Sequence, residues 1–373
     1  MPFVTDNLSR ERPQSLWADL SLPRREKYYP SPADWRNETL YFLLVDRFSD
    51  AKEDQRPLLD RGKLPAARRT NPEAWRWDEW ADSGQRRWQG GTIKGVTSKL
   101  DYLQKLGITA IWLSPVFKQR IHLDTYHGYG IQDFLDVDPR FGDRSDLVEL
   151  VRAAHERGMR VILDVIYNHS GDNWCYRVGD ESCVDMPGYS PGRYDFGNWR
   201  GADGSPIQSI ASKEDGVWPK ELQDPDDYTR AGLGRLDARP DEIDDPYAEH
   251  KRTDFMDLRD FDLTSPGVLT DLARCYKYWI ALTDCDGFRI DTLKHVSLQE
   301  ARNFCGSIKE FAANLGKDDF FLLGEVAGGD YNQDRYLDVV ERNLNATLDI
   351  GELKLNLNSV AKGFAPGRNY FGG

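Results

Sequence analysis

The chain has little of what marks membrane-bound or nucleic-acid-binding proteins. Its longest apolar runs, such as YFLLV at 41–45, are far too short to cross a bilayer. The N-terminal residues MPFVTDNLSRERPQS lack the apolar core of a secretory signal. The formal net charge of −13 argues against a nucleic-acid partner, because phosphate binding depends on concentrated lysine and arginine. We therefore expect a cytoplasmic protein with neither a membrane nor a nucleic acid as its partner.

The cysteines also lack the pattern of a disulfide framework or a zinc site. There are five of them and no CxxC pair, and an odd count fits reduced thiols better than paired ones. A bridge between Cys175 and Cys183 is geometrically conceivable, but the sequence favours free thiols.

What the sequence does contain is a large core made of short apolar segments. With 373 residues, 39% of them apolar and 12% aromatic, the chain can form one large domain or two ordinary ones. Most of the predicted strands are apolar on both faces, as in parallel strands covered by helices. These strands are YFLLVDRF (41–48), ITAIWLSPV (108–116), RVILDVIYN (160–168), GFRIDTL (287–293), FFLLGEVA (320–327) and ATLDIG (346–351).

Helices are expected between these strands, because apolar residues recur there at helical spacing between recognisable caps. Six strands alternating with helices favour either a (β/α)8 barrel or a doubly wound sheet. The predicted helices run from about Ser98 to Leu106, from Ser145 to before Gly158, from Thr264 or Ser265 through Trp279, and from Ser297 to before Gly316.

Two long irregular segments interrupt this series. Residues 49–92 form a polar, Trp-rich connection after the first strand, and residues 170–262 form a Gly-, Pro- and Asp-rich insertion after the third. The insertion is too long for an ordinary loop, so we expect a small inserted domain there. The barrel would then comprise residues 39–169 and 263–373, and residues 1–38 form a polar N-terminal extension.

Polar residues stand where strands end, which in a barrel is the catalytic face. Alternation along GFRID places Arg289 and Asp291 on the same face, so the guanidinium can hold the carboxylate ionised. Glu325 follows an apolar run, and desolvation raises the pKa of a carboxyl towards that of a proton donor. One charged and one protonated carboxyl, roughly 5 to 5.5 Å apart, suit glycoside cleavage with retention. The alternative is a structural ion pair between Arg289 and Asp291, with Glu325 capping the next helix.

The order of several motifs resembles glycoside hydrolase family 13, the α-amylase family. The resemblance runs from about residue 40 to residue 330 and implies a (β/α)8 barrel with a domain inserted after the third strand. The motifs are LDYLQKLGITAIWLSPVF (100–117), YHGYGIQDF (126–134), DVIYNH (164–169), LRDFDLTSP (258–266), GFRIDTLKH (287–295) and GEV (324–326).

The resemblance implies a role for each matching residue. Asp291 would be the nucleophile that forms a glycosyl-enzyme, Glu325 the general acid/base, and Arg289 the residue that orients Asp291. In the substrate site, Tyr129 would stack on the sugar with His127 nearby, and His169 would hydrogen-bond that sugar. Asp164 would lie behind these residues, and Lys294 and His295 would contact glucose units on the leaving side. Lys294 and His295 favour an α-1,4-glucan such as starch, glycogen or a maltooligosaccharide. Without the resemblance, ordinary core packing would explain Tyr129 and the histidines equally well.

Many members of that family bind a structural Ca²⁺, and the resemblance implies its ligands here. They would be the side chains of Asn168 and Asp260 and the backbone carbonyl of His295, an oxygen set that calcium prefers. The motif departs from the family at Arg259, where a proline is common. No organic cofactor is implied.

One family motif has no counterpart. The fourth signature supplies a histidine and a third aspartate after the seventh strand, yet the last histidine is His295 and the sequence given ends at Gly373. Asp330 and Asp349 do not stand in the right context to replace that aspartate. We therefore expect an incomplete barrel of about six βα units. Three interpretations stay open: part of a hydrolase, part of a transglycosylase or glucan isomerase, or a non-catalytic carbohydrate-binding remnant.

Overall fold

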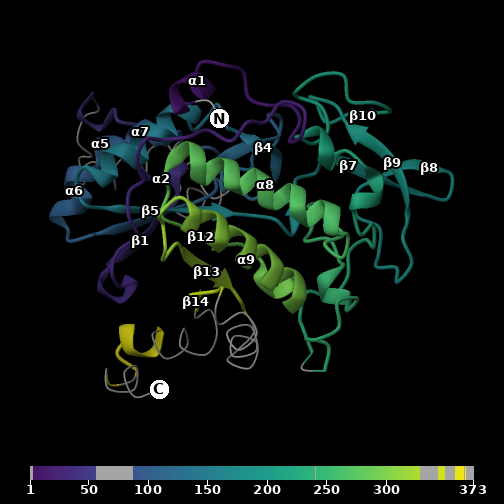
Figure 1. The fold of residues 1–373 in the computed structure, drawn as a ribbon. Coiled ribbons are helices and arrows are strands. Elements are labelled where there is room, and N and C mark those ends of the chain that lie inside the picture. Colours follow the sequence, from purple (N-terminus) through teal and green to yellow (C-terminus); the bar gives the residue numbers. More distant parts are fainter. Residues whose placement is uncertain are drawn as a thin grey trace, which may run out of the picture.

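The fold is organised around one parallel sheet of six strands (Figure 1). The computed structural model describes residues 3–55, 87–239, 241–327, 343–348, 358–364 and 366. Most of the Trp-rich connection, together with Asp330 and Asp349, lies outside these residues. The strands are β1 (Leu40–Leu43), β2 (Ala110–Leu113), β5 (Arg160–Val165), β12 (Gly287–Ile290), β13 (Phe321–Glu325) and β14 (Ala346–Leu348).

The order of the strands decides between the two sheet types left open by the sequence. The strands lie in the order β1-β2-β5-β12-β13-β14, and every neighbouring pair is parallel. A doubly wound sheet reverses its order at a switch point, whereas a barrel adds strands one after another. The arrangement is therefore barrel-like, and all six predicted strands are present.

The first predicted strand is shorter than the sequence suggested. β1 ends at Leu43, and Val45–Phe48 forms the short helix α2 instead. The reason is Asp46, whose buried carboxylate accepts hydrogen bonds from the backbone N–H groups of Gln89 and Gly90. These contacts turn the chain away from the sheet.

Three helices of twelve or more residues cover the sheet among the described residues. They are α7 (Arg144–His155), α8 (Pro266–Thr283) and α9 (Leu298–Asn314), and Figure 1 shows α8 and α9 side by side. The shorter helices are α1 (Val4–Leu8), α5 (Ile93–Ser98), α6 (Leu100–Lys105), η1 (Trp35–Asn37), η2 (Glu53–Gln55), η3 (Lys220–Leu222), η4 (Pro225–Asp227), η5 (Glu249–Lys251) and η6 (Leu293–His295). No helix in the described ranges is both long and apolar enough to cross a membrane.

Two predicted helix starts need correction. The cap of α7 is Asp143 and not Ser145, because the Asp143 carboxylate accepts from the Asp146 N–H at 2.9 Å. The helix predicted from Ser98 is two short helices, since Thr92 caps α5 earlier and Lys99 leaves the helical conformation. The other two starts are as predicted, at Ser265 and Ser297.

The expected insertion carries a sheet of its own, on the right in Figure 1. This antiparallel sheet has the order β10-β9-β7-β8. There are two further antiparallel pairs, β3 with β4 and β6 with β11, and an isolated bridge between Asp133 on β4 and Trp218 connects β4 to the insertion. Their bounds are β3 (Phe117–Gln119), β4 (Ile131–Val137), β6 (His169–Ser170), β7 (Trp174–Val178), β8 (Glu181–Val184), β9 (Asp195–Arg200), β10 (Pro206–Ile207) and β11 (Arg259–Asp260).

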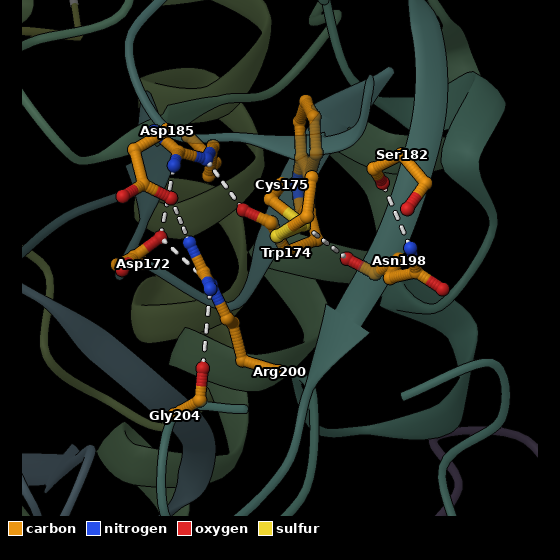
Figure 2. Close-up of a disulfide and its surroundings, with 10 residues drawn as sticks. Asp172, Trp174, Cys175, Ser182, Asp185, Asn198, Arg200 and Gly204 are labelled. Carbon is orange, nitrogen blue, oxygen red and sulfur yellow. Dashed lines mark hydrogen bonds and ion pairs between the residues drawn. A yellow bond between two sulfur atoms is a disulfide. The ribbon is translucent and has the colours of Figure 1, made fainter. Parts of the chain in front are cut away.

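The preference for free thiols was wrong for one pair of cysteines. Cys175 on β7 and Cys183 on β8 form a disulfide with their Cα atoms 5.1 Å apart (Figure 2). The hairpin brings them together, because the two strands pair antiparallel around a short turn. The other three cysteines are free and buried. Such bridges persist in oxidising compartments, and the cytoplasmic location stays a prediction.

The N-terminal extension joins the insertion to the helices outside the sheet. The Lys220 N–H in the insertion donates to the carbonyl of Gln14 at 2.8 Å. Arg274 on α8 donates to the carbonyl of Leu16 at 2.9 Å. Arg12 reaches deepest, since its Nε lies 2.5 Å from Oδ2 of Asp133 and both side chains are almost fully buried.

We predict that Arg12→Ala destabilises the protein by about 3 kcal/mol, because it leaves a buried carboxylate without its cation. Burial already raises the pKa of Asp133 to about 6, against the opposing effect of Arg12. The loss should therefore be larger at pH 8 than at pH 5, where Asp133 takes up a proton. Urea unfolding at both pH values measures it.

The matched control is Arg36→Ala, which breaks an ion pair with Asp34 at the surface, where Arg36 is 90% exposed. This change should leave the unfolding midpoint almost unaffected. The double variant Arg12→Ala/Asp133→Asn should regain part of the loss. Equal midpoints for Arg12→Ala and wild type would contradict the prediction.

Candidate active site

Strand register brings the candidate catalytic residues together. Asp164 on β5 pairs with Arg289 on β12, and Arg289 pairs with Leu323 on β13. Continued to the ends of β12 and β13, the same register sets Asp291 opposite Glu325. Neighbouring residues in a parallel pair point to the same face, so their carboxyl groups share one end of the sheet.

Arg289 is the centre of this cluster. Its Nη1 donates to Oδ1 of Asp291 at 2.6 Å and to Oδ1 of Asp164 at 2.9 Å. Its Nη2 lies 2.7 Å from Oε2 of Glu325. One guanidinium therefore holds three carboxylates, and the contact expected between Arg289 and Asp291 is present.

Asp164 is completely enclosed by donors. Its Oδ2 accepts from the indole N–H of Trp112 at 3.0 Å and from the hydroxyl of Tyr129 at 3.1 Å. Burial raises the pKa of Asp164 to about 6, although these donors and Arg289 act in the opposite direction. Trp112 was not among the residues expected from the sequence, because nothing in ITAIWLSPV distinguishes an indole donor from a core residue.

The surroundings of Asp291 act on its pKa in both directions. Burial raises the pKa of Asp291 well above its usual range, against the effect of Arg289, and the nearby Asp164 and Glu325 add to the rise. The sequence shows the arginine that favours the charged form. It does not show that two further acids share that arginine.

The surroundings of Glu325 also differ from the expectation of a lone carboxyl in an apolar wall. Its side chain is 26% exposed and contacts Arg289. The same oxygen, Oε2, accepts from the backbone N–H of Thr292 at 3.0 Å. Glu325 thus stands at the edge of the cluster, held by two donors and open to the cavity.

A cavity of about 580 Å³ gathers the remaining candidates. Asp291 and Glu325 open into this one space, as do five of the six residues that the family resemblance assigned to the substrate site: His127, Tyr129, His169, Lys294 and His295. The sixth, Asp164, lies behind Tyr129 and does not line the cavity.

The cavity histidines are uncharged at neutral pH. Burial lowers the pKa of His169 to about 3 and that of His295 to about 4. Nε2 of His169 lies 3.9 Å from Oδ2 of Asp291, and neither ring nitrogen of His169 has a hydrogen-bond partner among the described residues. His127 and Tyr129 stand with their rings 5.6 Å apart and nearly parallel.

The insertion supplies one wall of the cavity, which sequence reasoning missed. Phe255 has its ring centroid 6.5 Å from that of His169 and 5.8 Å from that of His295. Leu236, Met256 and Leu258 line the same wall. No local pattern could reveal this, because the insertion has neither helical nor strand periodicity at these positions.

The residues that the resemblance assigns to calcium gather only in part. Nδ2 of Asn168 donates to Oδ1 of Asp260 at 3.2 Å, and the other carboxylate oxygen is buried without a hydrogen-bond partner among the described residues. A cation would satisfy such an oxygen. The imidazole of His295 makes a different contact, because its Nδ1 lies 2.6 Å from the backbone carbonyl of His250. The described ranges contain no group of three or more His, Cys, Asp or Glu side chains that could hold a metal.

Comparison with known proteins places this site in a family. The model of the alpha-amylase catalytic domain matches residues 42–363. The chain belongs to the alpha-amylase family. The family comprises glycoside hydrolases that act on α-glucans, together with transglycosylases, and its catalytic domain is a (β/α)8 barrel in solved neighbours.

Three relatives show the range of similarity. An alpha-amylase of Streptomyces lividans is 34% identical over 70% of the chain and 30% of the relative. A cyclomaltodextrin glucanotransferase of Klebsiella oxytoca is 25% identical over 85% of the chain and 43% of the relative. The structure of an alpha-amylase from Geobacillus thermoleovorans complexed with acarbose is 28% identical, with a TM-score of 0.55 over 86% of the chain and 53% of that protein. The chain thus spans about half or less of these family members.

We predict that Asp291→Asn stabilises the alpha-amylase fold at pH 8 by about 1 kcal/mol. A carboxyl whose pKa is raised on folding contributes stability at low pH, and this contribution is lost as the pH rises through the raised value. The difference in the free energy of unfolding between the variant and wild type should therefore shrink towards pH 4. The melting temperature against pH measures it.

Asp19→Asn, at an exposed carboxylate, is the control and should give the same curve as wild type. If Asp291→Asn instead destabilises the protein equally at all pH values, the pKa of Asp291 is not raised on folding.

Proposed function

We propose that the protein carrying this chain is a retaining glycoside hydrolase of α-1,4-linked glucans. One observation supports this above the others: Asp291 and Glu325 share Arg289 and open into the same cavity. A structural ion pair would not need two separate carboxyls at the wall of a cavity large enough for sugar units. Residues 170–262 would serve as the inserted domain that closes the cavity with Phe255.

In the proposed first step, the Asp291 carboxylate attacks the anomeric carbon and the glycosidic C–O bond breaks. The leaving oxygen takes the proton of Glu325. In the second step Glu325 removes a proton from water, whose oxygen displaces Asp291 from the sugar. Both groups return to their starting states, and two inversions retain the configuration.

The other cavity residues would bind and orient the sugar. The ring of Tyr129 would stack on one face of a glucose unit, since its hydroxyl is already bound by Asp164. The uncharged His169 could exchange hydrogen bonds with sugar hydroxyls next to Asp291. His127, Lys294 and His295 would contribute further polar contacts around the cavity.

The second candidate is a transglycosylase or glucan isomerase, favoured by the similarity to a cyclomaltodextrin glucanotransferase. The same carboxyls would form the glycosyl-enzyme, and a sugar hydroxyl would replace water in the second step. Product analysis distinguishes the two, because transfer makes longer or rearranged glucans and hydrolysis makes shorter ones only.

We predict that a mechanism-based fluoroglycoside attaches covalently to Asp291, as seen by peptide mass spectrometry. Glu325→Gln should abolish turnover of maltooligosaccharides, with a loss of at least about 100-fold, because it removes the proton donor. Asp19→Asn again serves as the control. Glucan binding without labelling or turnover would support a carbohydrate-binding remnant and reject the enzyme.

We propose that Asn168 and Asp260, with the carbonyl of His295, would hold a structural Ca²⁺. The ion would neutralise the buried carboxylate and supply no chemistry to the reaction. We predict that Ca²⁺ added to chelator-treated protein raises the melting temperature by a few degrees, as mass action requires for a ligand of the folded state. Asp260→Asn should remove most of this rise. An unchanged melting temperature in wild type would reject calcium at this position.

A further inference from the structure

Thr292, the residue that follows Asp291, has an unusual backbone conformation. Its φ is +48° and its ψ is +32°, in the left-handed region. Five non-glycine residues among the described ones have positive φ, and Thr292 is the one β-branched member of that group. A β-branched side chain disfavours this region strongly, so the surroundings must impose the conformation.

The side chain of Thr292 does not explain this conformation. Thr292 precedes η6, where a threonine hydroxyl commonly caps the first turn, yet it makes no capping hydrogen bond. Its Oγ1 is buried and has no hydrogen-bond partner among the described residues. What the conformation does achieve lies in the backbone, whose N–H donates to Oε2 of Glu325 at 3.0 Å.

We infer that Thr292 is a positioning residue, whose turned backbone N–H fixes the carboxylate of Glu325 relative to Asp291. The peptide unit that carries this N–H begins at the carbonyl of Asp291. The candidate acid/base is therefore held against the nucleophile's own backbone, in addition to the contact through Arg289. Retention depends on the separation of the two carboxyls. The hydrogen bond from the Thr292 N–H therefore helps to keep Asp291 and Glu325 at a fixed separation.

The two donors to Glu325 differ in what they can fix. Arg289 is a side chain shared among three carboxylates, so its contacts do not fix the direction of Glu325 alone. The Thr292 N–H belongs to a strained and buried turn and has one acceptor. It therefore supplies direction, while Arg289 supplies charge. This inference rests on the proposed roles of Asp291 and Glu325.

The contact itself can be tested without any activity. In the full chain, the Thr292 amide proton should resonate downfield and exchange slowly with solvent. In Glu325→Ala its resonance should move upfield and its exchange should accelerate. If Glu325→Ala changes neither the amide resonance of Thr292 nor its exchange rate, the hydrogen bond does not exist in solution.

The role in the reaction is tested by replacing the Thr292 amide with an ester, which removes the N–H and keeps the side chain. Ala51 gives a matched control, because it also has a positive φ of 63° and an N–H that donates to a side-chain oxygen, Oγ of Ser49 at 3.1 Å, but lies exposed in a loop. The same ester at Ala51 should leave turnover unchanged.

The ester at Thr292 should slow cleavage of glycosides with poor leaving groups by at least about tenfold, since misdirected proton transfer is costly there. Glycosides with good leaving groups need little protonation and should be slowed much less. Equal slowing of both classes would mean a general structural role and would overturn the inference. If wild type neither turns over nor becomes labelled at Asp291, the proposed function fails and the catalytic role of Thr292 fails with it, whatever the amide resonance shows.

Discussion

One guanidinium shared by three carboxylates is the interaction on which the rest of the site depends. Arg289 is almost fully buried, so its charge must be balanced inside the protein, and Asp164, Asp291 and Glu325 exceed what one cation can balance. The excess negative charge makes proton binding favourable within the cluster. A reaction that needs one bare and one protonated carboxyl can use such a cluster.

The three acids differ in how far they are exposed to the cavity and to solvent. Asp164 is closed off by Trp112 and Tyr129, so it acts as a fixed part of the wall and cannot exchange protons with a ligand. Asp291 opens into the cavity but is deeply buried, whereas Glu325 is the most exposed of the three. The acid nearest to solvent is therefore the one that the proposed mechanism protonates and deprotonates in each cycle.

Part of this site could be predicted from strand period and parallel order, whereas the roles of Tyr129, Lys294 and the cavity histidines were implied only by the resemblance to the family. Apolar runs located the strands, and alternation placed Arg289 and Asp291 on one face. What depends on contacts between distant segments could not be predicted: the indole of Trp112 on Asp164, the wall built by Phe255, and the disulfide across the β7–β8 hairpin. The rise in the pKa of Asp291 could not be predicted for the same reason, since burial and shared partners are properties of the folded site.

The insertion is tied firmly enough to make its wall a fixed part of the cavity. Arg259 is fully buried and contacts Asp172 at 2.8 Å and Asp254 at 3.3 Å. Asp172 also lies near Arg200, which binds Asp185 beside the disulfide (Figure 2).

Arg259 also donates to the carbonyl of Trp174 on β7 at 2.8 Å. Because separating the buried Arg259 and Asp254 would cost much free energy, these contacts hold β7 rigidly against β11. Because Asp260 on β11 pairs with His169 on β6, that rigidity extends to the imidazole beside Asp291. The charged network of the insertion thus helps to set the position of a residue in the candidate active site, although none of its members lines the cavity.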